Sequence, residues 1–236
     1  MSVGQAMNKR VVAILIELRT HAPFTLFGAV TGIICMLVFR NLAYQSSYRI
    51  FYVFHPAHVV LSALVTASMF KLHSKRARFV LVLLVGFFGS IGIATLSDSL
   101  IPYIGELLLG MEPGVHGHGD AGFVEEAHIG FIEGWYVVIP AAALGILIAY
   151  FRPRTRFPHA GHVLLSTWAS SFHMLMAVGG KLSGWMVVGS FLFLFLAVWL
   201  PCCISDIVFP LLFVRGPAAA CYTRSEKFAE SSPNDG

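Results

Sequence analysis

The sequence predicts an all-α integral membrane protein of about six transmembrane helices, built as two three-helix repeats inserted in opposite orientations. Hydrophobic residues make up 57% of the 236-residue chain and charged residues only 12%, which is about half of the charged share of a soluble domain. Apolar runs close to the ~20 residues that cross a bilayer recur along the whole length. Short polar motifs also recur, in the same order, in the two halves of the chain.

Six apolar runs are expected to be spans. They lie at 22–39, 54–72, 79–97, 129–150, 160–178 and 183–200. The third run continues to Leu109 and the sixth to Val214, and each extension starts at a Ser-Asp pair and contains a proline. A proline removes a backbone donor from a helix, and such an interruption at membrane depth is tolerated only where it lines protein or a water-filled cavity. The third and sixth helices are therefore expected to be broken or kinked.

The uneven distribution of lysine and arginine predicts the orientation of the chain. Basic residues gather in 1–20, 71–78, 152–158 and 215–236, whereas 110–127 is rich in histidine and acidic residues. By the positive-inside rule, both termini are expected to be cytoplasmic, 1–20 as an N-terminal segment and 215–236 as a disordered tail, with 110–127 as an external loop. The net charge of +4 is explained by this orientation. No basic patch interleaved with aromatic residues exists, so nucleic-acid binding is excluded.

Three motifs indicate an internal duplication of residues 21–109 as 128–214. The pattern HAPF at His21 resembles HIGF at His128, HPAH at His55–His58 recurs as HAGH at His159–His162, and SDSLIP from Ser97 recurs as SDIVFP from Ser205. Because each unit has an odd number of spans, the second copy must enter the membrane upside down.

The inverted arrangement predicts two clusters of polar side chains. One lies near the outer membrane face and comprises His55, His58, Asp98 and His128. Its counterpart near the inner face comprises His159, His162, Asp206 and His21.

These residue types suit a transition metal. Residues three apart share one face of a helix, so each histidine pair can offer two imidazoles to one ion, and a third histidine and a carboxylate complete the set. Imidazole with carboxylate favours zinc, iron, nickel or cobalt over magnesium or calcium. The structural alternatives are histidines at the lipid interface and Ser-Asp pairs that cap a new helix segment. Ionisable groups inside a span are nevertheless costly, which favours function.

We therefore interpret the sequence as a permease for divalent transition-metal ions, zinc or iron first, and not as an enzyme. Its partners are then the metal ion and the lipid bilayer. The sequence is compatible both with a monomer and with a homo-oligomer. Two alternatives remain: a haem-binding electron-transfer protein with histidine axial ligands, and a membrane hydrolase whose metal activates water. The metal, the direction of transport and the coupling ion do not follow from the sequence.

Overall fold

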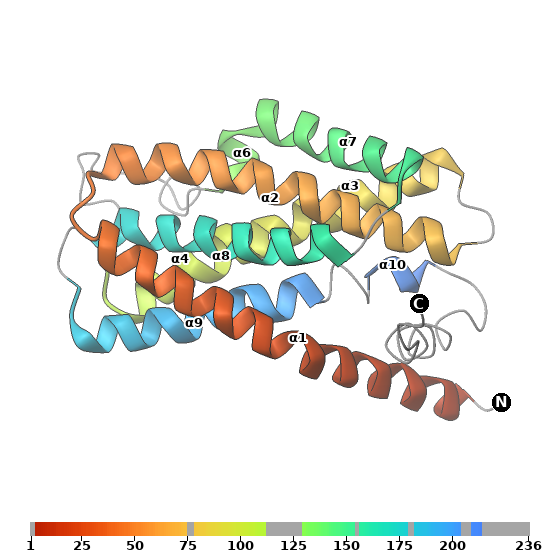
Figure 1. The fold of residues 1–236 in the computed structure, drawn as a ribbon, viewed down its shortest axis with the longest axis horizontal. Helices are drawn as coiled ribbons and strands as arrows, with labels where there is room; N and C mark the ends of the chain where they lie inside the picture. Colours follow the sequence, from red (N-terminus) through yellow and green to blue (C-terminus); the bar gives the residue numbers. More distant parts are fainter. Residues whose placement is uncertain are drawn as a thin grey trace, which may run out of the picture.

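The computed structural model describes residues 3–74, 78–111, 129–153, 156–178, 182–203 and 209–213. Within these ranges the regular structure is helical and contains no strand (Figure 1). In chain order the elements are α1 (Val3–Phe39), α2 (Tyr44–His73), α3 (Phe79–Thr95), the π-helical turn η1 (Leu96–Leu100), α4 (Ile101–Leu108), α6 (Gly130–Glu133), α7 (Trp135–Phe151), α8 (Arg156–Val178), α9 (Gly184–Cys203) and α10 (Phe209–Leu212).

Helix α8 occupies the middle of the bundle (Figure 1). It packs against α2 on one side and against α1 and α9 on the other, while α2 also packs against α3 and α7. The α2/α8 interface is antiparallel, because Phe54 near the start of α2 meets Phe172 near the end of α8, and His58 further along α2 meets His162. Residues from two distant parts of the sequence therefore face each other at the centre of the molecule.

Among the described residues, four helices are long and apolar enough to cross a membrane: His21–Phe39 within α1, Tyr44–His73, Phe79–Leu108 and Gly184–Cys202. Helix α7 (Trp135–Phe151) is apolar but shorter. All six expected spans coincide with described helices, and the four long ones are compatible with a multi-pass membrane protein.

Large apolar side chains cover the outside of the bundle, while polar side chains lie inside it beside the buried hydrophobic clusters. Large apolar side chains such as Phe27, Val38, Phe88 and Val188 are more than half exposed on the outside. The interior, in contrast, holds many buried polar side chains, and these are serines, threonines, histidines and two carboxylates. A soluble protein of this size rarely exposes so much contiguous apolar surface, so this distribution favours lipid around the bundle.

Helix α2 begins ten residues before the expected span. The sequence predicted a span from residue 54 and an external segment before it, but the helix starts at Tyr44. Tyr44, Tyr48 and Tyr52 stack along this first part of the helix, with neighbouring ring centroids 6.2 and 4.6 Å apart. As a result, the histidines that were expected to open the second helix lie near its middle.

The third predicted span continues as one 30-residue helical segment, Phe79–Leu108, through a π-helical turn. The N–H of Ile101 donates to the carbonyl of Leu96, a bond five residues back, and Pro102 follows in the first turn of α4. The proline lacks the N–H that would continue the regular α-helical pattern. The expected interruption is thus a bulge in the helix and not a break. At the equivalent place in the second half, α9 ends at Cys203 and α10 begins at Phe209, and Ser205 and Asp206 lie outside the described residues.

Gly145 allows α7 to approach α2 closely, which gives a test of the packing. A Cβ atom at this position would overlap the carbonyl oxygen of Val60 and lie 2.9 Å from the Cβ of Ala63. We expect Gly145→Ala to destabilise the fold by about 1–3 kcal/mol, because the obstacle is backbone and cannot move aside. Thermal unfolding in detergent measures this loss. Gly92 in α3 is the matched control, since nothing lies within 4 Å of its Cβ position, and Gly92→Ala should leave the melting temperature unchanged or raise it.

Candidate metal centre

His55 and His58 lie in the central part of α2 and point into the bundle. Both side chains are fully buried, at 0% exposure. They sit one turn apart on α2, where His58 meets His162 of α8 and both rings meet Asp98 of the π-helical turn. Pro56 lies between them and cannot donate a backbone hydrogen bond, which is tolerated here inside the helix.

The π-helical turn η1 places Asp98 between the two histidines. Oδ2 of Asp98 lies 2.9 Å from Nδ1 of His55 and 2.7 Å from Nδ1 of His58. A protonated Asp98 could donate its single proton to only one of the two histidines, so at least one imidazole donates to Asp98. An ionised Asp98 accepts a hydrogen bond from both imidazoles. We call His55, His58 and Asp98 the buried centre. π-Bulges often occur at functional sites, and this one presents the carboxylate.

The other carboxylate oxygen is held by serines. The hydroxyls of Ser97 and Ser166 donate to Oδ1 of Asp98 over 2.8 and 2.7 Å. Ser170, one turn further along α8, donates to the carbonyl oxygens of Ser97 and Ser166. With four donors around its two oxygens, Asp98 has the hydrogen bonds that a buried ionised carboxylate requires.

This arrangement leaves one nitrogen of each ring available. The Nε2 atoms of His55 and His58 are buried and have no hydrogen-bond partner among the described residues. A histidine that donates its Nδ1–H to a carboxylate presents the lone pair of Nε2, which is the usual way in which a carboxylate orients a metal-binding imidazole. Asp98 thus occupies the position of a carboxylate that orients two imidazoles, and the two Nε2 atoms are the atoms through which these rings would bind a ligand.

The histidines of the second half lie next to the buried centre. The ring centroids of His58 and His162 are 5.5 Å apart, those of His162 and His159 are 5.0 Å apart, and those of His159 and His21 are 4.3 Å apart. These four residues form what we call the histidine row. The sequence placed His58 and His162 in clusters near opposite membrane faces, but the structure brings their rings into contact.

Two of the expected site residues, His128 and Asp206, lie outside the described residues. A neighbour of His128 is described: a Cβ atom on Gly130 would lie 2.6 Å from Nε2 of His55. The start of α6 therefore reaches the ring of His55, and only glycine fits there without moving the ring. In the part of the chain that the structure describes, no group of three or more histidine, cysteine or acidic side chains has the geometry of a complete metal site.

Sequence reasoning missed the partners of two further carboxylates, Glu106 and Glu133. Glu106 lies beyond the expected span at 79–97, where an external position is expected, but it is 2% exposed and its Oε1 lies 2.7 Å from Nδ1 of His173. Glu133 accepts hydrogen bonds from the hydroxyls of Tyr52 and Tyr48, at 2.6 and 3.3 Å. One feature of the sequence indicates that Glu106 is buried: it lies eight residues after Asp98 in the same apolar run.

The geometry bears on the haem alternative. His55 and His58 sit on the same side of one helix and share one carboxylate oxygen, so the two rings cannot be the opposite axial ligands of a single iron.

Comparison with known proteins does not assign the chain to a family, since no family model, curated protein or solved structure matches it.

Proposed function

We propose that the protein is a polytopic membrane permease for divalent transition-metal ions, zinc first and then iron, nickel or cobalt. One observation carries the proposal: His55 and His58 both contact the same oxygen of Asp98 through Nδ1, and their buried Nε2 atoms are left without a hydrogen bond among the described residues. Burying two imidazoles and a carboxylate is costly. A metal ion at Nε2 supplies the missing interaction, and the charge of Asp98 offsets part of the charge of the ion.

Transport, as distinct from a structural metal, is supported by the polar surface that continues from the centre. Ser62 and Thr66 follow His58 along α2, and Ser166 and Ser170 follow His162 along α8, and all four are fully buried. The histidine row extends from the centre to His21 in α1. These side chains provide a series of weak ligands through the α2/α8 interface, and a permeating ion needs such successive sites.

The inverted repeat is part of this proposal, and the contacts between helices support it. In such a repeat α1, α2 and α3 correspond to α7, α8 and α9. The observed contact of α1 with α8 then corresponds to that of α7 with α2, the contact of α2 with α3 to that of α8 with α9, and the contact of α1 with α9 to that of α7 with α3. His58 and His162 hold equivalent positions in the two motifs, and their contact is what a two-fold axis through the α2/α8 interface would produce. The distribution of basic residues supports cytoplasmic termini.

The proposal is tested by measuring zinc binding to the purified protein and zinc uptake into proteoliposomes. We expect the parent protein to do both, and His58→Ala to bind zinc at least about tenfold more weakly, as is typical when the surroundings of a metal are damaged. His73→Ala is the matched control, because His73 lies on the same helix outside the buried centre, with its Nδ1 2.9 Å from the carbonyl oxygen of Met69 in the preceding turn. If the parent protein neither binds nor moves zinc, iron, nickel or cobalt beyond protein-free liposomes, the proposal is wrong.

A further inference from the structure

A second buried pair of ionisable groups lies apart from the buried centre. Nδ1 of His173 in α8 is 2.7 Å from Oε1 of Glu106 in α4, and the two side chains are 1% and 2% exposed. Neither residue is adjacent in sequence to a member of the buried centre. The metal-binding proposal leaves this pair without a function, although keeping a histidine and a glutamate inside an apolar bundle is costly.

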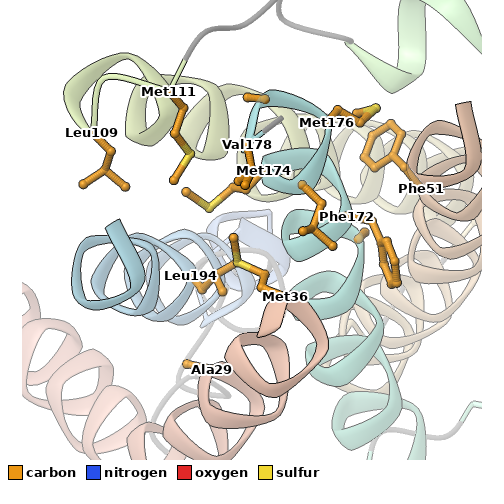
Figure 2. Close-up of a cluster of buried hydrophobic side chains, with 13 residues drawn as sticks. Ala29, Met36, Phe51, Leu109, Met111, Phe172, Met174, Met176, Val178 and Leu194 are labelled. Carbon is orange, nitrogen blue, oxygen red and sulfur yellow. The ribbon is translucent and has the colours of Figure 1, made fainter. Parts of the chain in front are cut away.

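The surroundings of the pair are apolar. Phe51, Met174 and Leu109 belong to the cluster of buried hydrophobic side chains drawn in Figure 2, to which α1 contributes Met36 and α9 contributes Leu194. Titratable side chains on the elements packed against the pair include Tyr103 on α4, Asp98 in η1, Cys35 in α1, and Tyr48, Tyr52, His55 and His58 in α2, and the described residues of α9 carry no charged side chain.

Phe51 separates the pair from the buried centre. Its ring stacks on His55 with centroids 5.3 Å apart, and the edge-to-face contact with His173 has centroids 5.4 Å apart. The two imidazole centroids therefore lie no more than about 11 Å apart, a range within which charges in a medium of low dielectric constant still interact strongly. A divalent ion at His55 and His58 would be sensed at His173–Glu106 without direct contact.

We propose that His173–Glu106 is the proton-coupling site of the permease, an inference that rests on the proposed metal transport. A neutral imidazole beside an ionised carboxylate gives the pair one negative charge. When the pair takes up one proton, its net charge becomes zero. A divalent ion at the buried centre and a proton on the pair carry charge of the same sign, so their electrostatic repulsion makes occupation of one site oppose occupation of the other. The proton is taken from water on one side of the membrane and released to the other as metal moves in the opposite direction.

The experiment follows zinc and protons together in proteoliposomes, with a zinc indicator and a pH indicator enclosed. In the parent protein we expect the interior to become more alkaline as zinc enters. Glu106→Gln retains an oxygen that accepts from Nδ1 of His173 but cannot exchange a proton. We expect it to bind zinc in detergent within about threefold of the parent, while the number of protons moved per zinc falls to less than about a tenth, as is typical when a group that transfers a proton is lost. His173→Gln should give the same result.

Two comparisons separate this inference from its alternatives. Glu133→Gln makes the same chemical change at a carboxylate that is bound by tyrosines, and it should keep the proton movement of the parent. An unchanged ratio of protons to zinc in Glu106→Gln overturns the inference, and so does a parent protein that moves zinc without protons, although the permease proposal then stands. A parent protein that moves no zinc defeats both.

Discussion

Removing the charge of Asp98 while keeping its shape should weaken zinc binding by about 10- to 100-fold, as expected when a carboxylate that orients metal-binding histidines is lost. In Asp98→Asn the amide oxygen can still accept from the two Nδ1 atoms, which lie 2.9 and 2.7 Å from Oδ2 in the parent. The amide nitrogen then faces the serine hydroxyls, which can turn and accept. The fold should survive, and the missing negative charge should raise the cost of placing a divalent ion at Nε2.

A graded control separates charge from hydrogen bonding. Ser166→Ala removes one of the hydroxyls that donate to Oδ1 of Asp98 but leaves the carboxylate ionised. We expect a loss of about fivefold in zinc affinity, equivalent to about 1 kcal/mol for one hydrogen bond. Both variants are measured by zinc titration of the purified protein, with thermal unfolding in detergent to confirm the fold. Asp98→Asn protein that binds zinc as tightly as the parent would show that the carboxylate does not orient a metal site.

The part of the centre that could be predicted from sequence is the part with a helical period. His55 and His58 are three residues apart, which places them on one face, and the motif that contains Asp98 repeats in step with the histidine motif. The structure brings these three residues together through hydrogen bonds. The pattern did not reveal that Asp98 contacts the histidines at Nδ1, because the spacing of residues contains no information about which ring nitrogen faces a partner.

The depth of the histidines in α2 could not be predicted from hydropathy. The residues from Tyr44 to Tyr52 include polar and aromatic side chains, a composition typical of the membrane interface, so the apolar run was taken to begin at residue 54. The structure extends the helix back to Tyr44, where the tyrosine rings stack and two hydroxyls bind Glu133. The hydroxyls of Tyr48 and Tyr52 donate to Glu133 of α6. The hydropathy of one segment contains no information about such partners on another helix.

The burial of Glu106 was missed for the same reason. A carboxylate after the end of an expected span looks external, and its partner His173 lies 67 residues away in the sequence. The contact between His58 and His162 also depends on how α2 and α8 cross, which is a property of the packing and not of either helix. Pairwise contacts between distant helices are therefore the main information that the sequence lacked.

The contact between His58 and His162 leads to the second large effect that we expect. Two separate sites near opposite membrane faces would make His58→Ala and His162→Ala independent, so that their losses in zinc affinity would multiply in the double variant. The ring centroids are only 5.5 Å apart, a separation at which both imidazoles can reach one ion. We therefore expect each single variant to lose about 10- to 100-fold in zinc affinity and the double variant to lose little more than the weaker-binding single variant.

The measurement is a double-mutant cycle on the zinc dissociation constant, with the parent, both single variants and the double variant prepared in the same detergent. His73→Ala combined with His162→Ala supplies the additive reference, because His73 lies at the end of α2, outside the buried centre, with its Nδ1 against the carbonyl oxygen of Met69. A double variant whose loss equals the product of the two single losses would contradict a shared group of ligands. Non-additive losses would instead mean that α2 and α8 supply neighbouring imidazoles to one ion, as expected if the ion passes from one helix to the other along the histidine row.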